Sequence, residues 1–227
     1  MRVGKESPDE EHRNDLIVLH AVRHLQASGF LPFHNCPLSE FGSVSKKVNQ
    51  TFNVDVTAIT TRMARLLYAI GRSIGPKLIV TIGSYQGNST IWLAAGAGPH
   101  AKVIGIDPDQ KANEIARGNF ARFGLNNIDV VLGDGHDIQN FISDTVDLVL
   151  LDADDPERGK ENYSSLVDAV WPVLTPGGTL LAHDVCWPKF QNDLVQYKKL
   201  TYDITRFTGK KTVAIDQFGL DIVRRAE

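Results

Sequence analysis

The segment VTIGSYQGNST, residues 80–90, decides the fold that we expect for this chain. Its apolar, β-branched beginning is typical of a buried strand, and the glycines at 83 and 87 then permit a tight turn. Any of the polar residues at 88–90 can cap a helix that follows. A ligand over such a turn meets backbone N–H groups and the positive end of a helix. We therefore expect a nucleotide-like cofactor here.

The composition describes an ordinary globular protein. The 227 residues are 42% hydrophobic and 22% charged, which fits one unit of the α/β type. With 24 basic and 27 acidic residues, the net charge of −3 favours neither nucleic acid nor an anionic membrane as a partner. Cys36 and Cys186 lie far apart, which favours a reducing compartment. No apolar run reaches the length of a membrane span, so we expect a cytoplasmic protein.

Strand and helix patterns alternate from residue 77 onward. Short apolar runs predict strands at 78–82, 103–106, 128–132, 146–151 and 179–183. Helical patterns lie between them, at 90–97, 110–123, 136–142 and 161–174. This alternation predicts a parallel sheet covered on both faces. Near the end, 202–207 and 220–224 are predicted as two strands without a helix between them, so they should pair antiparallel at one side of the sheet.

The first 76 residues have a different character. Ser7-Pro8-Asp9 predicts the start of a helix that Gly29 can end, and 57–74 carries a second helical stripe. Between them, 30–53 shows no clean period, and we expect this segment either to form a lid or binding loop or simply to cover the core. We therefore divide the chain into an N-terminal helical region, 1–76, and a sheet domain, 77–227.

Polar residues follow each predicted parallel strand. Because ligands of an open parallel sheet bind beyond the carboxyl ends of its strands, we expect these residues to share one rim. They are Gly83 to Asn88, Asp107, Asp134, Asp152 with Asp154 and Asp155, and His183 with Asp184. Asp107 lies 24 residues after Gly83, where an acid can accept hydrogen bonds from the hydroxyls of a ribose. The glycine spacing does not match the dinucleotide fingerprint, and no Walker-type lysine is present.

Three segments together resemble class I S-adenosylmethionine-dependent methyltransferases of the catechol and caffeoyl-coenzyme A O-methyltransferase group. They are 82–89 (IGSYQGNS), 150–154 (LLDAD) and 174–181 (LTPGGTLL), within a resemblance that covers about 78–225. The resemblance implies an α/β, doubly wound, mostly parallel seven-stranded Rossmann-like sheet with an antiparallel last strand and an N-terminal helical cap. It also implies a set of residues that bind S-adenosylmethionine: Gly83, Ser84, Tyr85, Gly87, Ser89, Asp107, Asp134, Gly135, His136 and Asp152.

The same resemblance raises the question of a metal. In the group, two aspartates and an asparagine hold a divalent cation, and Asp152 and Asp184 match the aspartates whereas Val185 takes the third position. Two carboxylates can suffice for magnesium, which keeps several waters, and Asp154, Asp155 or His183 is an alternative source of a further ligand. The group's catalytic lysine falls on Asp155, three residues beyond Asp152. We therefore expect the base to be His183, Asp155 or an N-terminal residue, and the catalytic set to be Asp152, Asp155, His183 and Asp184.

These expectations lead to a small-molecule O-methyltransferase, with magnesium assistance and a homodimer as further hypotheses. The acceptor pocket should include 153–160 and 184–190. One alternative keeps the cofactor but changes the reaction, to N-methylation, to a hydroxylation-type relative, or to cyclisation or alkyl transfer on the cofactor. Another is a cofactor-binding module without turnover, against which the presence of both Asp152 and Asp184 argues.

Overall fold

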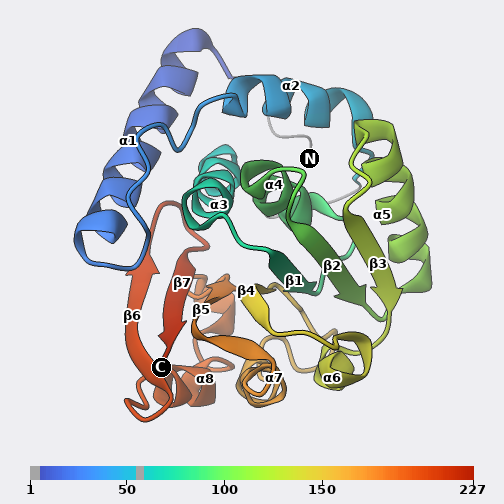
Figure 1. Cartoon of the computed structure of the whole chain (residues 1–227), viewed down its shortest axis with the longest axis vertical. Coiled ribbons are helices and arrows are strands. Elements are labelled where there is room, and N and C mark those ends of the chain that lie inside the picture. Colours follow the sequence, from blue (N-terminus) through green and yellow to red (C-terminus); the bar gives the residue numbers. More distant parts are fainter. Residues whose placement is uncertain (1–5, 55–58) are drawn as a thin grey trace.

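A single mixed sheet forms the centre of the molecule (Figure 1). The structure, a computed structural model, describes residues 6–54 and 59–227. The sheet has seven strands in the order β3-β2-β1-β4-β5-β7-β6, of which β7 runs antiparallel to its two neighbours. The strands are β1 Leu78–Ile82, β2 Lys102–Asp107, β3 Ile128–Leu132, β4 Val146–Leu151, β5 Leu174–His183, β6 Phe207–Val213 and β7 Leu220–Arg225. The Rossmann-like sheet with one antiparallel strand is thus confirmed.

Helices cover both faces of this sheet (Figure 1). On one face lie α3 Thr61–Ile74, α4 Asn88–Ala97 and α5 Gln110–Phe123. On the other lie α6 Ile138–Phe141, α7 Tyr163–Val170 and α8 Val195–Leu200, with the short 3-10 helices Gly135–Asp137 and Pro188–Phe190. Alternation within a strand divides its side chains between the two layers: in β1, Ile79 packs beneath α3 and α4, whereas Val80 packs on the α7 side.

The first two helices of the chain lie outside the two helical layers that cover the sheet. In α1, Pro8–Ala27, the predicted start is confirmed: Ser7 and Glu10 form a reciprocal capping box. The segment 30–53 is not irregular throughout, because it contains α2, Phe41–Thr51, which packs against α5 and places Phe41 on Tyr68 and Trp92. The predicted helix at 57–74 begins partly outside the described residues; its described part, α3, starts after a Thr60 cap.

Three sequence expectations were wrong in detail. The helix after the glycine loop begins at Asn88 with Gly87 as its cap, in a left-handed conformation and without a side-chain cap. The helix predicted at 161–174 covers only Tyr163–Val170, because Leu174 already belongs to β5. The strand predicted at 202–207 is largely a turn, and β6 starts at Phe207. Within the described part of the chain, no helix combines the length and the apolar character needed to cross a membrane.

Candidate functional site

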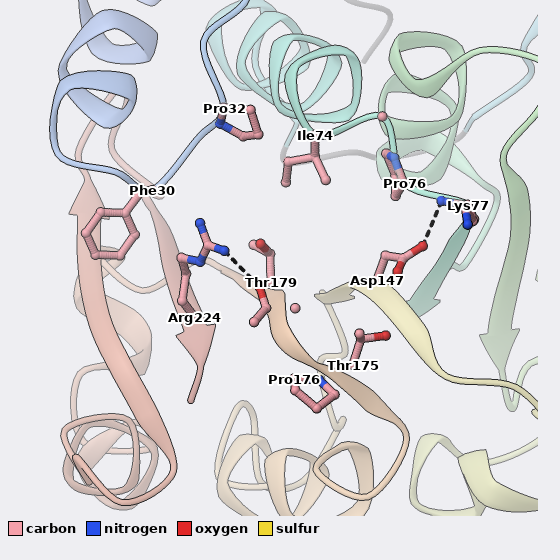
Figure 2. Close-up of a pocket in the computed structure, with 13 residues that line it drawn as sticks. Phe30, Pro32, Ile74, Pro76, Lys77, Asp147, Thr175, Pro176, Thr179 and Arg224 are labelled. Carbon is pink, nitrogen blue, oxygen red and sulfur yellow. Dashed lines mark hydrogen bonds between the residues drawn. The ribbon is translucent and has the colours of Figure 1, made fainter. Parts of the chain in front are cut away.

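The main cavity, of about 660 Å³, lies at the carboxyl ends of the parallel strands. Its wall includes the loops after β1, β2, β3, β4 and β5, so the structure brings the predicted rim residues together around one hollow. A second hollow of about 320 Å³ opens at the other end of the sheet (Figure 2). There Asp147 accepts the N–H of Lys77 and Arg224 donates to the carbonyl of Gly177, so these groups hold loops together. The size and the convergent polar groups favour the main cavity as the functional site.

The glycine loop fits closely against its neighbours. Gly83 has φ +79°, and a Cβ there would lie 2.5 Å from the Ala153 backbone, so the loops after β1 and β4 touch without an intervening side chain. Tyr85 has φ 44° although it carries a side chain, and this side chain is 46% exposed at the cavity. Ser84 is buried in the cavity wall, and its Oγ lacks a hydrogen-bond partner among the described residues. A bound ligand would satisfy this hydroxyl.

Asp107 ends β2 at the same wall. Its Oδ2 accepts the Tyr85 N–H at 2.8 Å and its Oδ1 accepts the Asp109 N–H at 2.9 Å, which fixes the carboxylate. Burial raises the pKa of Asp107 above its ordinary value. Each carboxylate oxygen keeps a lone pair for a further donor, so the pair can accept the two hydroxyls of a ribose. The geometry thus agrees with the role predicted for this residue.

The loop after β3 forms the neighbouring wall. Asp134 Oδ1 accepts the N–H of His136 at 2.8 Å and lies 2.6 Å from its Nδ1, while His136 Nε2 lies 2.8 Å from Ser165 Oγ. The hydrogen bond from the His136 backbone is the main reason why the pKa of Asp134 is lowered. Gly135 is needed because a Cβ there would lie 2.2 Å from Ile82. These residues form a polar strip beside the Asp107 wall.

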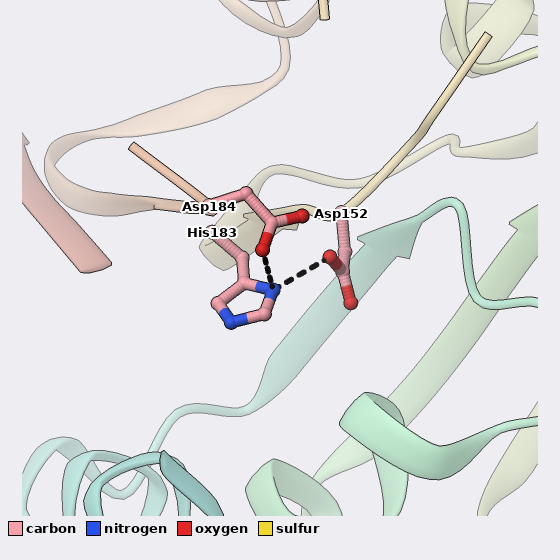
Figure 3. Close-up of side chains that lie close together, drawn as sticks. All are labelled: Asp152, His183 and Asp184. Atoms are coloured by element: carbon pink, nitrogen blue, oxygen red, sulfur yellow. Dashed lines mark hydrogen bonds and ion pairs between the residues drawn. The ribbon is translucent and has the colours of Figure 1, made fainter. Parts of the chain in front are cut away.

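Three acidic or imidazole groups meet after β4 and β5 (Figure 3). His183 Nδ1 lies 2.9 Å from Asp152 Oδ1 and 3.4 Å from Asp184 Oδ1. Burial by itself raises the pKa of Asp152, but His183, Lys160 and a hydrogen bond from Ser89 outweigh it, so the pKa is lowered. Burial likewise lowers the pKa of His183, and the neighbouring Asp152 carboxylate outweighs it, so this pKa is raised. Asp152, His183 and Asp184 are therefore one charged cluster.

A lysine that sequence counting missed joins this cluster. The Nζ of Lys160 lies 2.9 Å from Asp184 Oδ2 and 3.7 Å from Asp152 Oδ1, and it donates to the Tyr163 hydroxyl at 2.9 Å. Its side chain is 1% exposed. Counting three residues from Asp152 led to Asp155, whereas the lysine that lies beside Asp152 and Asp184 is Lys160. The intervening segment 155–159 loops outward and is closed by reciprocal backbone hydrogen bonds between Asp155 and Gly159, of 2.9 and 2.8 Å.

The residues of this cluster do not fit magnesium. Magnesium takes oxygen ligands in near-octahedral geometry, yet the third ligand position of the group carries the buried, apolar Val185. The imidazole nitrogen of His183 lies 2.9 Å from Asp152 Oδ1 and 3.4 Å from Asp184 Oδ1, and such a nitrogen suits transition metals better than magnesium. The Lys160 ammonium already contacts one of the two oxygens of Asp184, Oδ2.

The remaining predicted residues differ in where they lie relative to the cavity and the charged cluster. Asp155 lines the cavity but lies outside the charged cluster, and its carboxylate accepts the N–H groups of Glu157 and Arg158. These bonds, that of Arg158 first, lower the pKa of Asp155. Trp187 forms part of the cavity wall. The described wall includes Val54 and Ile59 but no residue of 30–53, so the lid role of that segment gains no support.

The fold and the cavity are those of a Rossmann-like methyltransferase, and comparisons with known proteins agree. Residues 80–185 match the family model described as a methyltransferase domain. A catechol O-methyltransferase of Mycobacterium tuberculosis is 30% identical over 130 residues, which are 56% of this chain and 57% of that protein. A probable cobalt-precorrin-6B C(15)-methyltransferase of Saccharolobus solfataricus is 26% identical over 125 residues, 55% of this chain and 60% of that protein. The chain thus matches well under two thirds of these relatives' length.

Solved structures share the fold over most of the chain. An O-methyltransferase from Bacillus cereus, in complex with SAH, has a TM-score of 0.62 at 20% identity and covers 90% of this chain and 97% of its own. An O-methyltransferase from Streptomyces achromogenes, in complex with SAM, has a TM-score of 0.65 at 17% identity, with coverages of 89% and 95%. These comparisons support the class I S-adenosylmethionine-dependent methyltransferases as the group that this chain resembles.

Proposed function

We propose that this protein transfers the methyl group of S-adenosylmethionine to an oxygen atom of a small-molecule acceptor. One observation supports it above all: a single cavity joins the predicted cofactor residues, from Gly83 to Asp134, to the charged cluster at Asp152 and Asp184. Its volume of about 660 Å³ lies within the range of small-molecule sites. The catechol O-methyltransferase among the relatives favours oxygen as the acceptor atom.

The cofactor end of the cavity would bind by shape and hydrogen bonds. We assign the ribose to Asp107, the adenine to the strip of Asp134, Gly135 and His136, and the methionine part to Ser84, whose hydroxyl has no hydrogen-bond partner among the described residues. When bound, S-adenosylmethionine supplies a methyl group on a positively charged sulfur that leaves as a neutral thioether. The protein then has to align the acceptor, and such alignment supplies much of the acceleration of a methyl transfer.

The acceptor end would be the wall formed by the loops after β4 and β5. Asp152 is the more exposed carboxylate of the cluster, with 17% of its side chain accessible against 8% for Asp184. Its carboxylate is therefore the group that we assign to take the proton of the acceptor hydroxyl as the new oxygen–carbon bond forms. Trp187 lies on the same wall, where it can contact an apolar acceptor. Magnesium, which the family resemblance implied, has no part in this proposal.

Calorimetry with S-adenosylmethionine and S-adenosylhomocysteine tests the first step. We expect both to bind wild-type protein, and Asp107→Asn to weaken both. Binding of neither would contradict the proposal. Incubation with catechols, phenols and amines, followed by mass spectrometry, then tests the acceptor atom. Products methylated at nitrogen or carbon, or release of methylthioadenosine, would favour the alternative reactions, and binding without turnover on any acceptor would favour a binding module.

Two further proposals concern the molecule as a whole. We propose a homodimer and a cytoplasmic location, each of which size-exclusion chromatography with light scattering and cell fractionation would test. The division into an N-terminal region, 1–76, and a sheet domain, 77–227, also stays a prediction. Helix α3 packs against one face of the sheet, with Leu66 and Ile70 in the same core as Trp92. This shared core argues that the two parts fold together.

A further inference from the structure

Two carboxylates at the acceptor end, the buried Asp184 and the partly buried Asp152, require positive charge close by. Asp152 and Asp184 both lie within 4.8 Å of the His183 imidazole, in a wall that is largely closed to water. Carboxylates in such a place are stable only when they are paired with cations or with several hydrogen-bond donors. The structure therefore has to supply an ammonium, an imidazolium or a metal ion at this point.

Lys160 supplies that charge in the position of a bridging cation. Its Nζ reaches one oxygen of each carboxylate, at 2.9 Å for Asp184 and 3.7 Å for Asp152. The ammonium is held there from the other side, because it donates to Tyr163 and lies 5.4 Å from the Phe190 ring centre. Tyr163 in turn donates to the Leu151 carbonyl, which anchors the arrangement to the end of β4.

The surroundings leave no good place for a second cation. A divalent ion bound to Asp184 would lie next to the Lys160 ammonium, and like charges at that distance in a buried wall repel strongly. The segment 155–159 is closed by backbone hydrogen bonds between Asp155 and Gly159, and Lys160 follows it in the cavity wall, where its side chain is 1% exposed. Val185 offers no oxygen in compensation.

We infer that this protein works without a divalent cation, because the Lys160 ammonium takes the cation's place between Asp152 and Asp184. This inference rests on the proposed methyl transfer for its meaning, although the charge arrangement can be tested by itself. Lys160 is then a positioning residue: it keeps both carboxylates in place and presents a fixed positive charge to the acceptor end of the cavity, whose wall it shares with Trp187.

The test compares metal responses of full-length protein that has been freed of metal with a chelator. Thermal unfolding is followed with and without millimolar Mg²⁺ or Mn²⁺ in wild type and in Lys160→Met, a variant that keeps the length of the side chain but removes its charge. Wild type should show no metal-dependent shift of its midpoint. Lys160→Met should gain a saturable upward shift with Mn²⁺, because its two carboxylates are left without a cation.

A matched control removes another buried lysine. Lys210 Nζ lies 2.8 Å from a single carboxylate, that of Asp221, so Lys210→Met should gain no comparable response to Mn²⁺. Lys160→Arg, which keeps a positive charge, should respond like wild type. If Lys160→Met does not fold, the wild-type titration still decides: a saturable Mg²⁺ or Mn²⁺ response in wild type that Asp184→Asn abolishes would overturn the inference.

Two measurements distinguish a failure of this inference from a failure of the proposed function. S-adenosylhomocysteine binding is measured in the same preparations, and its absence from wild type would refute the methyltransferase proposal while leaving the metal result intact. Turnover on an accepted substrate, once found, should be unchanged by chelator in wild type. Loss of turnover in chelator with full recovery in Mg²⁺ would contradict the inference and leave the methyltransferase proposal standing.

Discussion

Lys160 and Lys210 are both buried against aspartate, yet their neighbourhoods differ. Lys210 on β6 pairs with Asp221 on β7 at 2.8 Å and donates to Thr201, with side chains 5% and 1% exposed. Lys160 stands between two carboxylates and lines the main cavity. Lys210 and Asp221 pair one positive charge with one negative charge between two strands. Lys160 lies in the cavity wall, so its contacts with the two carboxylates help to set the charge that faces a bound ligand.

The largest effect should come from breaking the pair within the sheet. Lys210→Met leaves the buried Asp221 carboxylate without its cation, which should lower the free energy of unfolding by about 3–5 kcal/mol. Urea denaturation measures this loss. Affinity for S-adenosylhomocysteine should not change in folded protein. Lys210→Met combined with Asp221→Leu should recover most of the stability, and failure to do so would mean that Lys210 acts through packing and not through its charge.

The corresponding change at the cavity should cost less stability. Lys160→Met should lower the free energy of unfolding by about 1–3 kcal/mol, because Asp152 is partly open to cavity water and His183 still faces both carboxylates. The same urea titration measures it. Turnover, by contrast, should fall in this variant and not in Lys210→Met. An equal loss of stability in Lys160→Met and Lys210→Met would contradict the expected difference between the cavity site and the pair within the sheet.

Asp107 extends the comparison to a buried carboxylate that backbone N–H groups satisfy in place of a lysine. Asp107→Asn removes the charge that would accept the ribose hydroxyls, so affinity for S-adenosylhomocysteine should fall about 10- to 100-fold, which corresponds to roughly 1.5–3 kcal/mol. Calorimetry measures the affinity. Because burial raises the pKa of Asp107, its charge contributes little to folding, and the variant should be nearly as stable as wild type. Undiminished affinity would contradict the ribose role.

The smallest effect is expected at an exposed carboxylate, Asp134. Its pKa is lowered in the folded protein by the His136 backbone N–H, so its charge stabilises the fold above the unfolded pKa, near 3.8, and this contribution is lost as the pH falls through the lower folded value. Asp134→Asn keeps a capping side chain and should cost only a few tenths of a kcal/mol at pH 6. The difference from wild type should vanish below about pH 3. If the stability difference between wild type and Asp134→Asn grew on acidification, it would contradict a lowered pKa of Asp134 in the folded protein.

Much of the fold followed from local patterns. The limits of the strands at 78–82, 128–132 and 146–151 were predicted as the structure has them, because each is a short run rich in β-branched and leucine side chains. Helix α2 was missed because its start at Glu40 is left-handed and lacks a side-chain cap, so its sequence carries no ordinary start signal. The start of β6 was misplaced because Tyr202 and Ile204 are apolar yet exposed.

The residues of the site also divide into those that the sequence predicted and one that it missed. Residues that follow a strand directly, such as Asp107, Asp152 and Asp184, could be found because strand ends fix their place. Lys160 could not be found by counting from Asp152, since the segment 155–159 leaves the wall and returns. A signal was nevertheless present: Lys160 stands just before the helix at Tyr163, and a turn containing Pro156 and Gly159 precedes it.

That closed segment has a consequence for how such a protein can change. Because Asp155 and Gly159 are joined to each other by backbone hydrogen bonds, residues between them can be exchanged or added while the chain re-enters the wall at the same point. Arg158, which stands at the cavity mouth, belongs to this exchangeable tip, whereas Lys160 does not. Under the proposed function, the tip between Asp155 and Gly159 can be exchanged by loop grafting to vary the cavity mouth, while Lys160 and its charge balance stay in place.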